Sequence, residues 1–155
     1  QVLMILNTKS AARKVYDLLE GRTEGALYYL STQMCAEHRS DVLKEIKKKL
    51  LSEEPVICIS TQLVEAGVDF SFRCVIRSLA GLDNLIQAAG RCNRDGKLDM
   101  GHVYLIKMSP ETENISSLPD IGQARKAMME FLDEYEKHQN RFGNRMDSEQ
   151  SIVFL

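Results

Sequence analysis

Short apolar runs alternate with longer amphipathic segments along this chain. Five runs rich in β-branched and large aliphatic residues are predicted as strands, namely 2–6, 26–30, 56–60, 74–78 and 103–108. Most of them are apolar at every position rather than at alternate positions, which is typical of strands buried on both faces. The pattern therefore predicts a parallel sheet with helices on both faces.

The segments between these runs carry apolar residues at helical spacing. Helices are predicted at 9–20, 40–51, 83–91 and roughly 121–140, and 109–119 is predicted as a loop. Thr8 is the expected N-cap of the first helix, and Gly21 is its expected stop. Ser40 or Asp41 is expected to cap the second helix, and Asp83 to open the third. Strands that alternate with helices predict a single α/β domain.

Length and composition fit one folded domain. The chain has 155 residues, of which 44% are hydrophobic, and this is enough for a real core. No apolar run approaches the ~20 residues that span a bilayer, so no membrane contact is expected. The chain begins at Gln1 rather than Met, and we expect it to be part of a longer protein.

Charge and cysteine content narrow the choice of partners. The net charge is −2, so any site for a polyanion must be a local cluster. The four cysteines form no C-x-x-C pair, which argues against a zinc site and favours reduced thiols in the cytoplasm.

Three predicted strands end in hydroxyl-bearing or amide-bearing pairs, Asn7–Thr8, Ser31–Thr32 and Ser60–Thr61. In an open α/β sheet, ligands bind beyond the carboxyl ends of the strands. Hydroxyls and the free N–H groups of a following helix can hold phosphate oxygens there. The alternative is that these residues only cap helices, which is favoured for a single pair but less so for three on one edge.

The motif "GVD" at 67–69 can contact a nucleotide. Gly67 lets the backbone approach a ligand, and the carboxylate of Asp69 can accept hydrogen bonds from ribose hydroxyls. The alternative is an ordinary turn with a solvated Asp69, and this motif alone favours that alternative.

The motif "GRCNR" at 90–94 indicates a nucleotide site more strongly than "GVD" does. Arg91 and Arg94 are three residues apart and Gln87 is four before Arg91, so on a helix all three would share a face. Two adjacent guanidinium groups suit a polyphosphate, whose oxygens match their planar fork. Two solvated arginines are the alternative, but the small residues at 88–90 suggest close packing instead.

His38 and Arg39 fall in the predicted loop after the second strand, near the ligand-binding edge, and are candidates for a phosphate contact. The lysines at 44–49 are interpreted as a solvated helix face.

Two parts of a complete nucleotide site are not found in the sequence. It contains no G-x-x-x-x-G-K-[ST] loop to cradle phosphates, and no Asp-Glu pair at a strand end to hold magnesium. The candidates thus make half a nucleotide site, and the other half is expected from another domain.

The order of Asn7–Thr8, "STQ-VEAGVD" and "QAAGRCNR" resembles the second RecA-like domain of superfamily 2 helicases over residues 1–108. Three longer stretches, "LSTQMCAEHR" at 30–39, "STQLVEAGVDFSF" at 60–72 and "LDNLIQAAGRCNRDG" at 82–96, resemble the helicase–nuclease of type I CRISPR systems.

The resemblance implies a role for each matched residue. Nucleic-acid contacts are implied for Asn7, Thr8, Ser31, His38, Arg39 and Thr61. Nucleotide contacts are implied for Gly67, Asp69, Arg91 and Arg94. Catalytic roles are implied for Gln87, Arg91 and Arg94, with Arg94 as the arginine finger. The cofactor would be ATP, shared with a first RecA-like domain that would also hold Mg²⁺.

The expected function is that of an ATP-dependent translocase on single-stranded DNA in CRISPR interference, with the CRISPR surveillance complex as a partner. Residues 109–155 are expected to lead towards a downstream region, and the chain alone is expected to be inert. One alternative is domain 2 of another superfamily 2 DNA or RNA helicase. The other is a non-catalytic module that binds a partner, against which the intact Arg91 and Arg94 speak.

Overall fold

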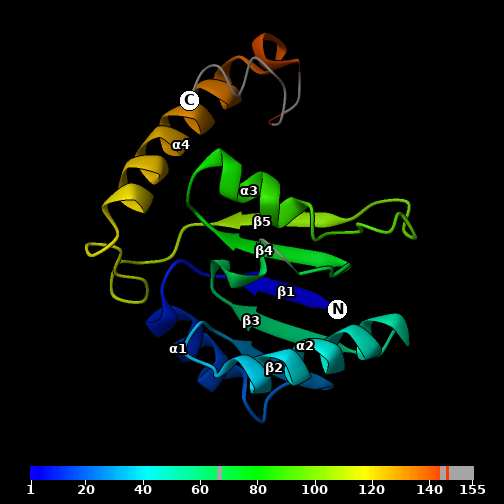
Figure 1. Ribbon diagram of the computed structural model, residues 1–155. Coiled ribbons are helices and arrows are strands. Elements are labelled where there is room, and N and C mark those ends of the chain that lie inside the picture. Colours follow the sequence, from blue (N-terminus) through cyan, green and yellow to red (C-terminus); the bar gives the residue numbers. More distant parts are fainter. Residues whose placement is uncertain (66–67, 144–145, 147–155) are drawn as a thin grey trace.

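A computed structural model of the protein describes residues 1–65, 68–143 and 146. Five strands form one parallel sheet in the order β2-β3-β1-β4-β5 (Figure 1). The strands are β1 (Val2–Ile5), β2 (Ala26–Leu30), β3 (Val56–Ser60), β4 (Cys74–Ser78) and β5 (His102–Ile106). The predicted parallel sheet is confirmed, and only the ends of the first and last strands are shifted.

Four α-helices connect or follow the strands. They are α1 (Lys9–Leu19), α2 (Ala36–Leu51), α3 (Leu82–Ala89) and α4 (Pro119–Lys137), with short 3-10 helices η1 (Gln62–Val64) and η2 (Gln139–Phe142). The predicted ends of α1 are confirmed. The Thr8 hydroxyl accepts a hydrogen bond from the Ala11 N–H at 3.1 Å, and Gly21 follows the helix with a φ of +72°.

One predicted helix start is wrong, and another is shifted by one residue. The second helix begins at Ala36 rather than at residue 40, after Cys35, so Ser40 and Asp41 lie inside it and cap nothing. Its first residues are mostly exposed and carry no apolar repeat, although Ala36 favours a helix and Glu37 complements the helix dipole. The third helix begins at Leu82, one residue before Asp83, with Gly81 as its N-cap.

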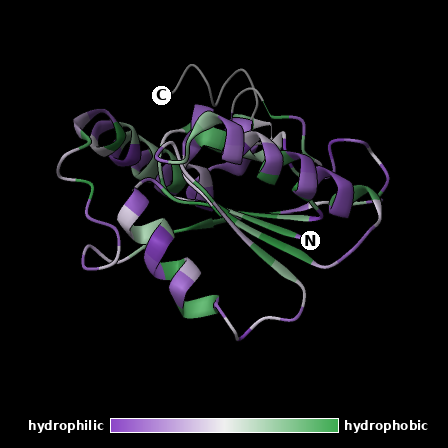
Figure 2. Cartoon of the chain, turned by 60° about the horizontal axis from the view of Figure 1, so that its bottom comes forward, coloured by the Kyte–Doolittle hydropathy of each residue, from purple (hydrophilic) through white to green (hydrophobic). Residues whose placement is uncertain are grey.

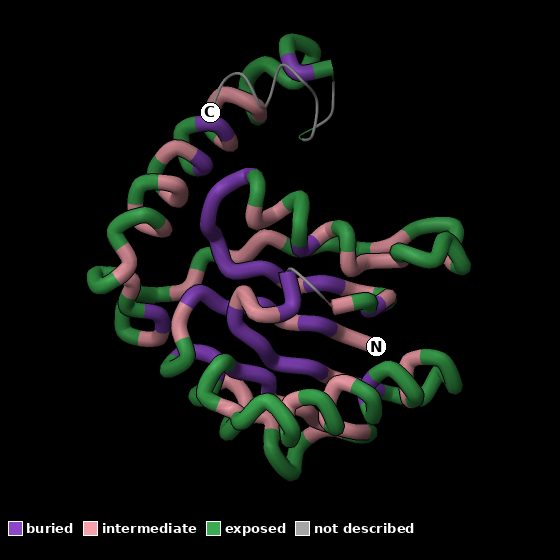
Figure 3. Tube along the Cα trace, viewed as in Figure 1, coloured by how far each residue is buried: buried purple, intermediate pink, exposed green. Residues whose placement is uncertain are grey.

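Both faces of the sheet carry a hydrophobic core (Figures 2 and 3). On one face, strand residues such as Leu3, Cys58 and Val75 pack with Ile46 of α2 and Ala88 of α3. On the other face, α1 packs against the sheet through the residues Ala11, Ala12, Leu6 and Ile59. Successive strand side chains point to opposite faces, so strands that are apolar throughout fill both cores. The prediction of helices on both faces is confirmed.

The last helix packs against the end of β4 and the start of α3. Met128 and Phe131 are buried with Leu79 and Leu82, on the apolar side that the sequence predicts for this helix. The Phe131 ring meets Phe142 edge-on, with ring centres 5.3 Å apart.

The described residues also show the state of the cysteines and whether any helix could cross a membrane. All four cysteines are free thiols. No helix in residues 1–65 or 68–143 is long and apolar enough to cross a membrane.

Candidate nucleotide and nucleic-acid sites

The hydroxyl and amide side chains after the strands meet on one edge of the sheet. Ile5 and Leu30 are both in register with Ser60, so β1, β2 and β3 end side by side. Asn7 and Thr61, which follow two of these strands, are at most 5% exposed. The polar side chains therefore do meet at the carboxyl edge of the sheet, as predicted, but Asn7 and Thr61 among them are buried.

Several of these groups already have partners within the chain. Thr8 caps α1, and the Ser31 hydroxyl accepts a hydrogen bond from the Gln33 N–H at 3.3 Å. Ser60 donates to the Leu30 carbonyl at 3.2 Å. Thr61 precedes η1, and its side chain makes no cap hydrogen bond within the described residues. The Thr8 hydroxyl thus caps α1 as an acceptor, as the alternative predicts, and its O–H can still donate to a phosphate. The Thr61 hydroxyl caps no helix.

His38 and Arg39 lie in the first turn of α2, and the predicted loop at this position is wrong. This helix follows β2, so its first turn lies near the carboxyl edge of the sheet. His38 is exposed and Arg39 is half-buried. The helix therefore presents both side chains near the end that carries its positive dipole.

Arg91 and Arg94 do not share a helix face, and this prediction is wrong. The helix ends at Ala89, and the chain then turns through Asn93, whose φ of +46° lies in the left-handed region. The turn is held by Phe72, whose N–H donates to the Arg91 carbonyl and whose carbonyl accepts from the Asn93 N–H, each at 2.8 Å. Gln87 stays on the helix and is exposed.

This pairing brings the "GVD" and "GRCNR" motifs together. The Nε atom of Arg94 lies 3.4 Å from Oδ1 of Asp69, and Nζ of Lys47 lies 3.5 Å from Oδ2. The side chain of Asp69 is 70% exposed and that of Arg94 is 46% exposed. Exposed ion pairs contribute little free energy, so a ligand can replace them. Gly67 lies outside the described residues.

Arg91 is held more firmly than Arg94. It donates from Nε to the Val64 carbonyl at 2.9 Å and from Nη2 to the Glu65 carbonyl at 2.7 Å. Burial lowers the pKa of Arg91, and the charge of Arg94 lowers it further, whereas Asp69 opposes the shift. The charges of Arg94 and Asp69 thus both act on Arg91, and two guanidinium groups against one carboxylate leave an excess of positive charge for an anion.

The two groups of candidates occupy different parts of the sheet. Lys47 lies in the second half of α2, and Phe72 comes two residues before β4, so Asp69 and Arg94 lie towards the amino ends of the strands. Thr8, Thr61 and Arg39 lie at the carboxyl ends. The candidates for nucleotide contacts and those for nucleic-acid contacts therefore lie towards opposite ends of the strands.

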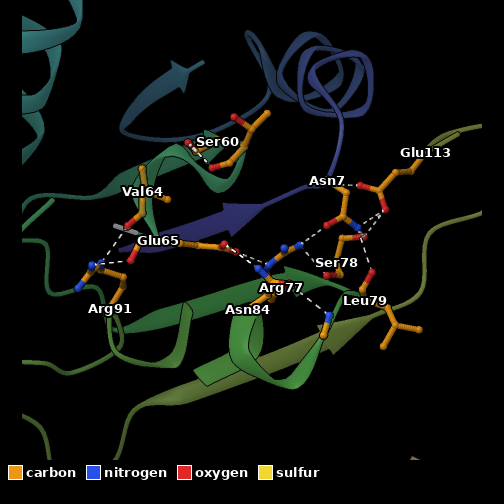
Figure 4. A network of polar contacts seen from close by, with 12 residues as sticks. Asn7, Ser60, Val64, Glu65, Arg77, Ser78, Leu79, Asn84, Arg91 and Glu113 are labelled. Carbon is orange, nitrogen blue, oxygen red and sulfur yellow. Dashed lines mark hydrogen bonds and ion pairs between the residues drawn. The ribbon is translucent and has the colours of Figure 1, made fainter. Parts of the chain in front are cut away.

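A buried polar network connects these two regions (Figure 4). Its centre is Arg77, which is 0% exposed and pairs through Nε with Oε1 of Glu65 at 2.7 Å. Arg77 also donates from Nη1 to Oδ1 of Asn7 at 2.8 Å, and the backbone N–H of Asn7 donates to Glu113 at 2.6 Å. Burial raises the pKa of Glu65, and the charge of Arg77 opposes that rise.

Sequence reasoning missed this network. The signal for Arg77 was its place inside the apolar run "CVIRS", since a buried arginine requires a partner. Glu113 lies in a polar loop, and nothing in the local sequence distinguishes it. Among the described residues, no group of three or more His, Cys, Asp or Glu is arranged to hold a metal ion.

A family model described as CRISPR-associated nuclease/helicase Cas3, C-terminal, matches residues 1–97. The nuclease/helicase Cas3 of Methanothermobacter thermautotrophicus is 29% identical over 136 residues, which cover 85% of this chain and 16% of that protein. This chain thus spans less than a fifth of that relative.

Solved structures support the same relationship at the level of fold. T. fusca Cas3 with AMPPNP has a TM-score of 0.71 and 22% identity, and the match covers 86% of this chain and 18% of that one. A chain of a CRISPR RNA-guided surveillance complex, pre-nicking, has a TM-score of 0.68 and 20% identity, with 99% and 21% covered. The C-terminal domain of the DEAD-box protein Dbp5 has a TM-score of 0.51 and 13% identity, with 83% and 69% covered, and the RecA-like fold class is confirmed.

Proposed function

Because this chain belongs to the family of the C-terminal region of the CRISPR-associated nuclease/helicase Cas3, we propose that it supplies the second RecA-like domain of an ATP-dependent translocase on single-stranded DNA. We assign this domain to residues 1–108. The translocase acts in CRISPR interference. The observation that carries the proposal is the meeting of Arg91, Arg94 and Asp69 on one surface, with Arg91 fixed by two backbone carbonyls.

The residues of this surface fit a nucleoside triphosphate. Nε and Nη2 of Arg91 are used within the chain, and no described residue accepts from its Nη1, which is left for a phosphate oxygen. Arg94 is held only by an exposed ion pair that an anion can displace. Asp69 is exposed and can accept hydrogen bonds from ribose hydroxyls, and Gly67 comes two residues before it in the sequence.

ATP, when bound, supplies the phosphoryl group whose transfer to water releases free energy. Arg94 places its guanidinium where negative charge grows on the transferred group, and Arg91 holds the phosphates from a fixed position. Gln87, exposed in the last turn of α3, is assigned a catalytic role beside the two arginines in this proposal. The phosphate loop and the Mg²⁺ ligands come from a first RecA-like domain of the same protein.

The carboxyl edge of the sheet binds the single strand in this proposal. Thr61, with a hydroxyl that caps no helix, and Arg39, at the start of α2, contact phosphates. Thr8, Ser31 and His38 complete this edge, and Asn7 fixes the turn before Thr8 from within the protein. The likeness to a chain of a surveillance complex supports that complex as a partner.

The experiment is ATP hydrolysis by the intact protein that contains this chain, measured with oligo-dT, with oligo-U and without nucleic acid. The proposal expects strong stimulation by DNA and little by RNA. Stimulation by RNA alone would support the alternative of an RNA helicase, and a protein that hydrolyses no ATP under any condition would refute the proposal.

A further inference from the structure

We propose that Arg77 is a positioning residue that couples nucleotide binding to DNA binding through its buried contacts with Glu65 and Asn7. This inference rests on the proposed function, since it assigns the two ends of the network to the two ligands. Each end of the network is a residue that touches a candidate site, and Figure 4 shows both ends in one view.

The nucleotide end of the network runs through Glu65. The backbone carbonyl of this residue accepts from Nη2 of Arg91, and its side chain pairs with Arg77 at 2.7 Å. The second carboxylate oxygen accepts from Nδ2 of Asn84 at 3.2 Å, near the start of α3. A phosphate bound to Arg91 therefore acts on Glu65 through this hydrogen bond, and the side chain of Glu65 passes the effect to the guanidinium of Arg77.

The nucleic-acid end runs through Asn7. Its Oδ1 accepts from Arg77, and its Nδ2 donates to the Leu79 carbonyl at 3.0 Å. Glu113 accepts from both the backbone N–H and Nδ2 of Asn7, at 2.6 and 3.0 Å, and the Ser78 hydroxyl donates to the same carboxylate. These contacts fix the backbone directly before Thr8, which begins the proposed DNA contact.

A purely structural role does not explain this arrangement well. Buried ion pairs often add no stability over apolar side chains of the same volume, so a sheet interior has little need of one. Nη2 of Arg77 is buried and has no hydrogen-bond partner in the part of the chain that the structure describes. That spare donor gives Arg77 a means to exchange acceptors when Glu65 moves, and this exchange is the second arrangement that the proposal requires.

The test is the affinity of the intact protein for oligo-dT, measured with and without the non-hydrolysable analogue AMPPNP. The ratio of the two dissociation constants is the coupling factor, and linked sites typically show about 5–150-fold. We expect Arg77→Lys and Glu113→Gln each to bring this factor close to one. The matched control is Arg13→Lys in α1, where Arg13 makes an exposed ion pair with Asp17, and its factor should equal that of the wild type.

A structural role would lower thermal stability or both affinities but would leave the coupling factor unchanged. Wild-type coupling in both variants would therefore overturn the inference, as would a wild-type protein that binds both ligands without coupling. If the Arg77→Lys variant does not fold, the coupling factor of Glu113→Gln tests the inference alone. Glutamine keeps the shape of the glutamate side chain, so this variant is expected to fold. A wild-type protein that binds neither ligand would instead refute the proposed function.

Discussion

Arg94 lies against Asp69, with Nε 3.4 Å from Oδ1, although the two residues come from motifs more than twenty positions apart. The backbone pairing of Phe72 with Arg91 and Asn93 brings the two motifs together. The ion pair thus joins the proposed finger to the proposed ribose contact. In the proposed function, both side chains exchange this ion pair for contacts with the nucleotide.

Asp69→Ala in the intact protein should raise the KM for ATP with little change in kcat. A hydrogen bond to a charged group contributes about 1.5–3 kcal/mol, which corresponds to roughly tenfold or more in KM. A ribose contact is made equally before and during the reaction, so kcat should be spared. Steady-state kinetics measures both values, with Asp17→Ala as the control on an exposed carboxylate of α1. A fall in kcat at unchanged KM would argue against the ribose assignment.

Thr61→Ala combined with Arg39→Ala should weaken binding of single-stranded DNA by the intact protein. Loss of a phosphate contact lowers affinity for every sequence and reduces the slope of log K against log salt by about 1. Titrations at several salt concentrations measure the slope. Lys48→Ala, at the far end of α2, is the matched control and should change neither quantity. An unchanged slope in the double variant would place the DNA elsewhere.

Phe131→Ala in this chain should lower the free energy of unfolding by about 3–5 kcal/mol, because the side chain is 0% exposed and lies in the core under α4. Urea denaturation measures this value. Met129→Ala on the same helix is the control, since Met129 is 37% exposed and should change stability by no more than about 0.5 kcal/mol. Equal effects of the two substitutions would mean that α4 does not pack on the domain.

The purified chain should hydrolyse no ATP, with or without single-stranded DNA. It carries no phosphate loop in its sequence, and its described residues offer no metal-binding group. A phosphate-release assay at high protein concentration measures turnover. DNA-stimulated turnover that follows the chain through purification would contradict the division of the site between two domains.

The motifs of the sequence identify the family through their resemblance to it. The parallel sheet and the covered faces are predicted correctly, because strands that are apolar on both sides have few other folds available. The prediction fails at the start of α2, where exposed residues carry no periodic signal. It also fails for Arg91 and Arg94, whose spacing suits a helix while their backbone pairs with Phe72 instead. Such a long-range contact overrides local spacing and is invisible within a window of a few residues.

The sequence likewise predicts some features of the site residues and not others. Asn7 and Thr61 are found at the strand ends that the sequence predicts, because the ends of neighbouring parallel strands share one edge. The sequence does not reveal that Asn7 is buried against Glu113, since that contact joins residues 106 positions apart. Which residues form the buried network depends on tertiary packing.

The central claim is that Arg94 is the arginine finger, and ATP hydrolysis by Arg94→Ala in the intact protein tests it most directly. A finger stabilises charge that develops in the transition state, and it contributes roughly 10³–10⁵ in turnover in other nucleotide hydrolases. With saturating single-stranded DNA, we expect Arg94→Ala to lose about 10³-fold or more in kcat while DNA binding stays close to wild type. Arg94→Lys should recover little, because an ammonium group lacks the planar fork. Arg13→Ala should retain full activity. Turnover of Arg94→Ala within a few-fold of the wild type would contradict the account.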